Sequence, residues 1–162
     1  MREHRASLDL PHPPERLWAL MQDYARWTEY APMVLRVDVL HPGDANGNGL
    51  LRRVVYQLPF GRQGSALELV TEVVPAQGYH YTMISRAPGN DQTGRVRLER
   101  IGASRTRLHF EERYHLVGWP WRWFEGPIYR FINRKNEESM LRMSAWLTAH
   151  PDYRPELIAG PS

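Results

Sequence analysis

One glutamate sits where the sequence pattern predicts a buried position. Phe110, Glu112 and Tyr114 alternate along a strand-like segment and share a face that is otherwise apolar. A buried carboxyl group must be paired, hydrogen-bonded or protonated, and in a cavity it can act as a general acid or base. Glu112 is therefore the candidate catalytic residue. The alternatives are a structural ion pair with Lys135 or Arg53, or a strand end that reaches solvent.

Three polar residues lie on or beside the apolar stripe of a second segment, 127–149. At helical spacing, Ser139 falls near the centre of this stripe, Asn136 inside it and Lys135 at its margin. A buried hydroxyl or amide without a partner costs about 1–3 kcal/mol. Each polar group therefore needs a partner. A neighbouring protein group, a water molecule and a bound ligand are all consistent with the pattern.

Aromatic and apolar side chains accompany these polar groups. Tyr79, Tyr81 and Met83 share a face and combine apolar bodies with polar tips, which suits a flat hydrophobic ligand, although core packing also explains each of them. The predicted ligand-binding set consists of Tyr79, Tyr81, Met83, Phe110, Glu112, Tyr114, Ile128, Phe131, Ile132, Lys135, Asn136, Ser139 and Met143.

The histidines do not follow a metal-binding pattern. His109 and His115 are too far apart along one strand to share an ion, and His80 stands alone. The others, His4, His12, His41 and His150, fall in termini or turns. The chain has no cysteine, no glycine-rich phosphate loop, and no HExxH or GxSxG motif. We therefore expect no metal and no cofactor.

Short turns divide residues 33–117 into six strand-like segments. The turns fall at 43–49, 60–64, 75–78, 87–91 and 102–104, where Gly, Pro, Asn and Asp gather. Connections this short imply that consecutive strands are antiparallel neighbours. The weakly alternating segment 6–10 would add a seventh strand.

Helices are expected on both sides of these strands. Pro13, Pro14 and Glu15 are typical of a helix start, and a second short helix would cover 25–31. The segment 127–149 has no internal Gly or Pro and is long enough to cross a whole sheet. The order predicts an α+β fold in which a curved antiparallel sheet of about seven strands wraps around a long C-terminal helix and leaves a cavity.

Composition sets limits on the class of protein. With 162 residues, 42% hydrophobic and 24% charged, we expect one domain over 1–150 and a flexible tail over 151–162. The net charge is only +3 and the arginines are spread along the chain, which argues against nucleic acid as a partner. No apolar run reaches the ~18 residues of a membrane span, and no secretory signal opens the chain. A cytoplasmic location is expected.

Two N-terminal stretches carry a family resemblance. The sequence PPERLW at 13–18, followed by DYARWTEYAP at 23–32, the strand TRLHFEE at 106–112 and the closing helix, resembles the START-like superfamily, also called SRPBCC or Bet v 1-like. The branch it resembles is polyketide cyclase/dehydrase and lipid transport, over roughly residues 5–149. The resemblance implies a helix-grip fold whose deep cavity holds lipids, sterols, quinones or polyketides in relatives. It assigns no catalytic residue, because the superfamily shares no catalytic motif.

Three tryptophans crowd the segment just before the closing helix. Trp119, Trp121 and Trp123 would cap the mouth of the cavity, contact a partner protein or touch a membrane surface. Folding back over the edge of the sheet is the alternative. The segment is therefore predicted to lie at the cavity mouth.

Three hypotheses of function follow from these features. The first is binding or transport of a hydrophobic small molecule, such as a lipid, quinone or polyketide-like compound, by a monomer or homodimer. The second is an enzyme of the aromatase/cyclase type without metal, in which Glu112 and a tyrosine or Lys135 move protons. The third is a protein-interaction module that uses the tryptophan-rich segment.

Overall fold

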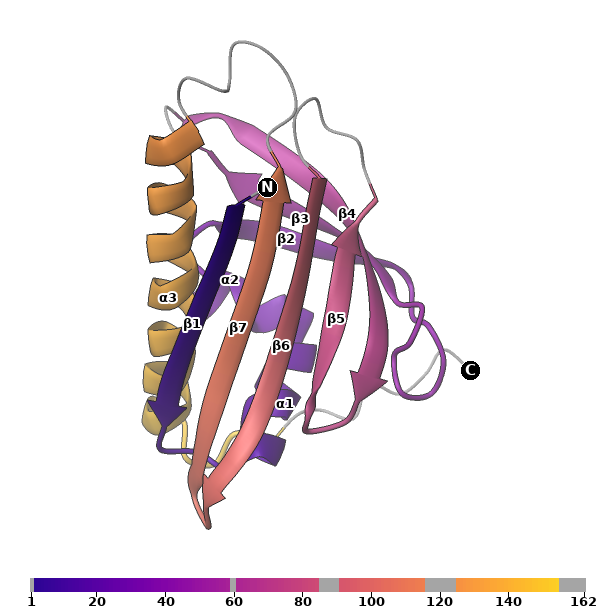
Figure 1. Ribbon diagram of the computed structural model, residues 1–162. Coiled ribbons are helices and arrows are strands. Elements are labelled where there is room, and N and C mark those ends of the chain that lie inside the picture. The colour runs from indigo at the N-terminus through magenta and orange to yellow at the C-terminus, as the bar shows by residue number, and fades with distance from the viewer. Residues whose placement is uncertain (1, 59–60, 85–90, 116–124, 155–162) are drawn as a thin grey trace.

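The sheet and the C-terminal helix dominate the architecture (Figure 1). The computed structural model describes residues 2–58, 61–84, 91–115 and 125–154. The elements are β1 (Arg2–Leu10), α1 (Pro14–Gln22), η1 (Tyr24–Arg26), α2 (Trp27–Tyr30), β2 (Val34–His41), β3 (Leu51–Gln57), β4 (Gln63–Val74), β5 (Gly78–Met83), β6 (Asp91–Gly102), β7 (Arg105–His115) and α3 (Glu125–Ala149). Seven antiparallel strands, two short helices after the first strand and a long final helix confirm the predicted α+β class.

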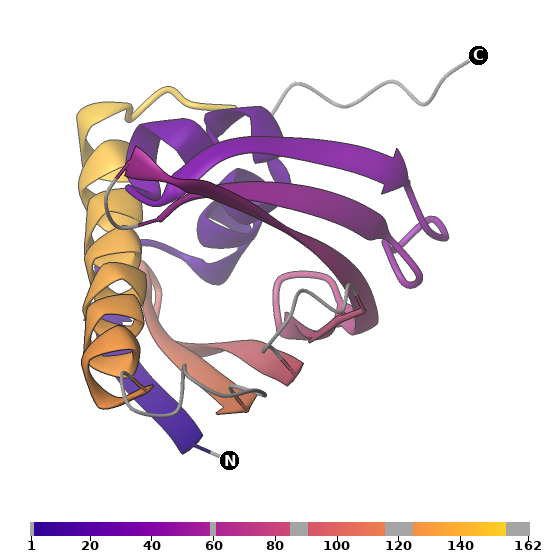
Figure 2. The same cartoon turned by 90° about the horizontal axis from the view of Figure 1, so that it is seen from above.

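The sheet is strongly curved around α3. Its strand order is β1-β7-β6-β5-β4-β3-β2, so β1 and β2 form its two edges. Seen from above, these edges flank α3 on opposite sides, and the middle strands close the far side of the curve (Figure 2). A register shift between Thr71 and Val74 interrupts the pairing of β4 with β5, and such bulges increase the bend of a strand.

The short helices close one end of the curve. The helix α1 starts as predicted, because the carbonyl of Pro13 accepts bonds from the amides of Arg16 and Leu17 and no amide is needed at Pro14. Its buried residues include Leu17 and Leu20, which belong to the hydrophobic core. This packing places α1 and α2 inside the curve beside α3 (Figure 1).

Strand β7 shows the alternation that the sequence predicts. Leu108 and Glu112 are buried on the inner face, whereas Glu111 and Arg113 are exposed on the outer face. Across the sheet, α3 buries Met140, Met143 and Leu147 in the core. The inward position of Glu112 is therefore confirmed.

The register of β3 differs from the prediction. We expected Arg53 to face inward, but Arg52 and Val54 are buried and Arg53 is exposed. Pairing with β4 explains the difference, because Arg52 lies opposite Glu68 and can be neutralised there. A charged residue thus occupies a core position that alternation alone would assign to an apolar one.

Two histidines are more enclosed than the sequence indicates. His4 is not in a loose terminus but on the inner face of β1, where it is 8% exposed and packs edge-on against Phe110. His12, in the turn after β1, is also buried, and its Nε2 lies 2.9 Å from the carbonyl oxygen of Ser144 on α3. Both side chains therefore join the N-terminal strand to the body of the protein.

The start of the predicted tail makes specific contacts. The hydroxyl of Tyr153 donates to Asp23 Oδ2 at 2.9 Å, and its ring packs edge-on against Trp146. Residues 155–162 lie outside the described residues. Among the described helices, none is both long and apolar enough to cross a membrane.

Candidate ligand pocket

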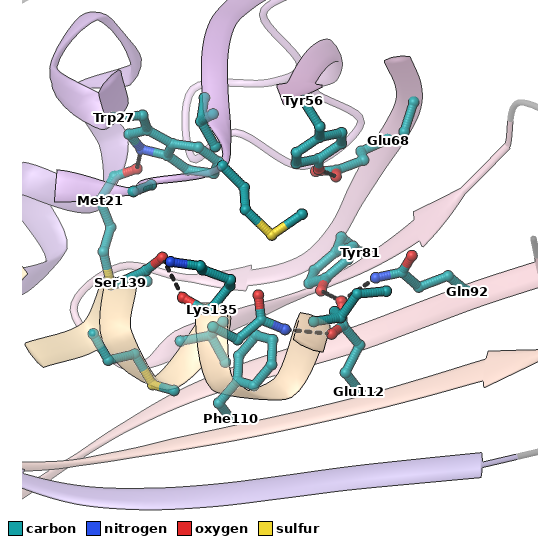
Figure 3. A pocket seen from close by; sticks show the side chains of 18 of the residues that line it. Met21, Trp27, Tyr56, Glu68, Tyr81, Gln92, Phe110, Glu112, Lys135 and Ser139 are labelled. Atoms are coloured by element: carbon teal, nitrogen blue, oxygen red, sulfur yellow. Dashed lines mark hydrogen bonds between the residues drawn. The ribbon is translucent and has the colours of Figure 1, made fainter. Parts of the chain in front are cut away.

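A pocket of about 370 Å³ lies between the inner face of the sheet and α3 (Figure 3). Much of its lining is apolar, including Met21, Trp27, Met83, Phe110 and Met143. Pockets for small molecules usually measure about 300–1,000 Å³ and are mostly apolar with a few placed polar groups. This space therefore has the size and character of a small-molecule site.

The pocket gathers most of the residues predicted to bind a ligand. Its lining includes Tyr79, Tyr81, Met83, Phe110, Glu112, Ile132, Lys135, Asn136, Ser139 and Met143. Phe131 is 38% exposed and is not part of the described lining. The side chains of Tyr114 and Ile128, and the whole of Trp119, Trp121 and Trp123, lie outside the described residues.

Glu112 is the centre of a buried hydrogen-bond network, here called the Glu112 centre. The carboxylate is 3% exposed, and Asn136 Nδ2 on α3 donates to its Oε2 at 2.8 Å. The hydroxyl of Tyr81 and the amide of Gln92 both donate to Oε1. The carboxylate is thus held by hydrogen bonds from β5, β6 and α3.

The two partners predicted for Glu112 are wrong. Lys135 instead pairs with Glu138 on its own helix, with Nζ 2.7 Å from Oε2. Arg53 points to the outer face of the sheet. The lysine therefore forms an i, i+3 pair along its own helix.

A glycine lets Tyr81 reach Glu112. Tyr81 on β5 pairs with Gly94 on β6, which in turn pairs with Glu112 on β7. A Cβ atom at Gly94 would lie 2.2 Å from Tyr81 Cζ, so any other residue would collide with the ring. Burial and the nearby Glu112 carboxylate raise the pKa of Tyr81 well above its usual value, so the phenol keeps its proton.

A second polar group, here called the Glu68 centre, was missed by the sequence analysis. Arg52 donates to Glu68 Oε2 through Nε at 2.9 Å and Nη2 at 2.8 Å, and the Tyr56 hydroxyl donates to Oε1 at 2.6 Å. The rings of Trp27 and Tyr24 lie 4.5 and 5.3 Å from the guanidinium carbon. The sequence did contain a signal for this centre, because Arg52 shares a strand face with Val54, and Glu68 shares one with Ala66 and Val70. That the two charged residues pair with each other follows only from the register of β3 with β4.

Ser139 satisfies its hydroxyl within the helix. Its Oγ donates to the carbonyl of Lys135, four residues earlier, at 2.8 Å. Asn136, by contrast, donates to a side chain rather than to a backbone carbonyl. Of the two polar residues on the helix stripe, only Asn136 therefore connects the helix to the sheet through a side-chain pair.

The pocket can hold an apolar molecule and form hydrogen bonds with its polar groups. Figure 3 shows Tyr56 with Glu68 on one wall, Tyr81 with Gln92 and Glu112 on another, and Lys135 and Ser139 on the helix. Within the described part of the chain, no three His, Cys, Asp or Glu residues lie close enough to hold a metal ion. The tyrosine–carboxylate pairs are the groups that could exchange hydrogen bonds or a proton with a bound molecule.

A sheet that grips its C-terminal helix, with a pocket between the two, defines the helix-grip class of START-like, or Bet v 1-like, proteins. Within this class, the chain belongs to the polyketide cyclase / dehydrase and lipid transport family, whose sequence model matches residues 1–147. A search of curated proteins finds no match.

Several solved structures share this fold. The Zhui aromatase/cyclase from Streptomyces sp. R1128 superposes with a TM-score of 0.79 at 14% identity, covering 99% of both chains. TTHA0849 from Thermus thermophilus gives 0.77 at 18% identity, over 91% of this chain and 98% of that one. Ara h 8.0201 gives 0.70 at 14% identity with the same coverage. At these identities the likeness shows the fold alone.

Proposed function

We propose that this protein binds and carries a hydrophobic small molecule, of the lipid, quinone or polyketide-like kind, in the pocket between the sheet and α3. The observation that carries the proposal is a space of about 370 Å³ whose apolar walls include Trp27, Phe110 and Met143 and whose lining contains two ordered polar centres. Burial of roughly 200 Å² of apolar ligand surface would contribute about 5 kcal/mol before the costs of association. The polar centres would orient the ligand within the apolar walls.

Native mass spectrometry of the purified protein tests the proposal, with extraction of any bound molecule under denaturing conditions. Ser139→Phe places a large ring in the pocket lining, whereas Ala145→Phe places the same ring on an exposed position of the same helix. We expect a stoichiometric hydrophobic adduct that is lost in Ser139→Phe and kept in Ala145→Phe. A protein that stays bare after incubation with lipids, quinones and aromatic polyketides would contradict the carrier proposal.

A second candidate is cyclisation of a polyketide-like substrate, which the Tyr81–Glu112 hydrogen bond favours. In an aldol closure, one enolised carbon attacks a carbonyl carbon, and dehydration then releases one water molecule. Glu112 would take the proton from carbon and a neighbouring acid would protonate the carbonyl oxygen. The test is turnover of a synthetic poly-β-ketone, which mass spectrometry detects as a product lighter by 18 Da (the mass of one water). It should be abolished by Glu112→Gln, while ligand retention persists.

The remaining predictions concern the tryptophan-rich segment, the oligomeric state and the location of the protein in the cell. Contact of the tryptophan-rich segment 118–124 with a protein or a membrane concerns residues outside the described ones. Cosedimentation with lipid vesicles, with and without Trp121→Ala and Trp123→Ala, tests membrane contact. Analytical ultracentrifugation distinguishes a monomer from a homodimer, and cell fractionation tests the expected cytoplasmic location.

A further inference from the structure

Two tyrosine hydroxyls in the pocket lining point their protons at carboxylates. Tyr81 donates to Glu112, and Tyr56 donates to Glu68 at 2.6 Å. Burial, reinforced by the neighbouring carboxylates, raises the pKa of both phenols well above the usual value. Each phenol therefore keeps its proton.

The Tyr81 hydroxyl donates to Glu112, and the other partners of this carboxyl group are donors as well. Gln92 and Asn136 both present amide N–H groups to this carboxylate, and an amide N–H can only donate. Glu112 is therefore an acceptor toward both amides. Tyr81 is the donor in its own bond with Glu112, since the phenol keeps its proton.

A phenol has one proton and two lone pairs. Because the proton of Tyr81 is committed to Glu112, its oxygen has only lone pairs left for a bound molecule. Among the residues that the structure describes, none donates a hydrogen bond to this oxygen. The nearby cations are already engaged, Arg52 with Glu68 and Lys135 with Glu138. Tyr81 therefore offers the pocket a hydrogen-bond acceptor.

We propose that the pocket selects a flat hydrophobic molecule that carries a hydroxyl group, and that this hydroxyl donates its hydrogen bond to the Tyr81 oxygen. The inference rests on the proposed function, namely that the pocket binds a hydrophobic small molecule. It narrows the ligand class to phenols and ring alcohols over the matching ethers. An ether has no O–H group, so it cannot donate a hydrogen bond to the lone pairs of the Tyr81 oxygen. Binding the ether would leave a buried acceptor unsatisfied.

Tyr79 provides the matched control. It lies two residues before Tyr81 on β5, is also buried and lines the same pocket. The Arg52 guanidinium lies 5.7 Å from the centre of its ring, and among the described residues the Tyr79 hydroxyl donates to no carboxylate. Loss of the Tyr79 hydroxyl should therefore leave the preference for hydroxyl ligands unchanged.

The test measures displacement of 1-anilinonaphthalene-8-sulfonate by 2-naphthol, 2-methoxynaphthalene and naphthalene from the full chain. We expect 2-naphthol to bind about tenfold more tightly than its methyl ether, the effect of one hydrogen bond. The preference should persist in Tyr79→Phe and fall severalfold in Tyr81→Phe/Glu112→Leu, which removes the phenol oxygen and the carboxylate together. Circular dichroism checks that each variant is folded, and the wild-type comparison needs no variant at all.

The outcomes separate this inference from the proposed function. If all three probes bind wild type equally well, the pocket binds hydrophobic molecules but the hydroxyl preference is refuted. A preference retained in the folded double variant overturns the assignment to Tyr81. If no probe binds and no adduct is extracted, the proposed function itself fails.

Discussion

The inner and outer faces of the same sheet carry the same kind of ion pair in opposite environments. On the inner face, the side chains of Arg52 and Glu68 are 3% and 4% exposed. On the outer face, those of Arg107 and Asp9 are 43% and 36% exposed, although their contact of 2.6 Å is as short. Distance alone therefore does not distinguish the two pairs.

The difference lies in what would remain if one partner were removed. An exposed charge without its partner is solvated by water, so the pair contributes little. A buried charge without its partner keeps its desolvation cost, which several kcal/mol of attraction had offset. The inner pair therefore holds the pocket wall in one arrangement, whereas the outer pair contributes little to stability.

The largest effect is expected for Arg52→Leu. The substitution leaves Glu68 buried with Tyr56 as its remaining donor, and we expect a loss of about 3–5 kcal/mol in the free energy of unfolding. Urea denaturation followed by circular dichroism measures the change. The double variant Arg52→Leu/Glu68→Leu should recover part of the loss, because it removes both charges. A loss below about 1 kcal/mol in the single variant would show that the inner pair behaves like a surface pair.

Gly94→Ala tests the inner face without changing any charge. The new methyl group would collide with the Tyr81 ring, and the strain should cost about 1–3 kcal/mol and displace the hydroxyl from Glu112. Gly126→Ala is the control, since a Cβ there meets nothing within 4 Å and the free energy of unfolding should change by only about 0.5 kcal/mol or less. Equal stabilities of the two variants would contradict the close approach of Tyr81 to Gly94.

A smaller effect is expected from the buried histidine. Burial, partly offset by the Glu137 carboxylate 3.7 Å from Nε2, lowers the pKa of His4 below its usual value. The unfolded chain therefore binds a proton more readily, so His4 stabilises the fold above about pH 6.5 and this contribution is lost as the pH falls toward the folded pKa.

The variant His4→Leu isolates this contribution. We expect the stability of wild type relative to His4→Leu to fall between pH 7.5 and pH 5, measured by urea denaturation at each pH. Taking the difference between the two proteins removes the contribution of all other titrating groups. A difference that does not change with pH would show that His4 is neutral or charged to the same extent in both states.

The sequence predicted the fold and the position of Glu112, because both follow from local patterns. Turns rich in glycine delimit the strands, Pro13 and Pro14 mark the start of α1, and strict alternation along β7 places Glu112 inward. Each of these signals is read within about ten residues. Ten residues of the predicted binding set line the pocket for the same reason.

The partners of the buried charges could not be predicted in this way. Arg52 meets Glu68 only through the register of β3 with β4, and Asn136 meets Glu112 only through the docking of α3 on the sheet. Alternation alone favoured Arg53 over Arg52 as the inward-facing residue of β3. It does not take into account that a buried arginine can be paired with a glutamate on the next strand. The need for glycine at position 94 could not be predicted either, because it arises only from the close approach of the Tyr81 ring.

The smallest effect is expected on the outer face, where Arg107→Ala removes the closer of the two arginines that pair with Asp9. Because both side chains are well exposed, the loss in the free energy of unfolding should be far smaller than that of Arg52→Leu and should shrink further at 1 M salt, where the screening length falls to about 3 Å. The Arg52→Leu effect should persist at the same salt concentration, since buried charges are poorly screened. If high salt reduced both losses to the same degree, water would reach Arg52, and the pocket wall would be a solvated surface like the outer face.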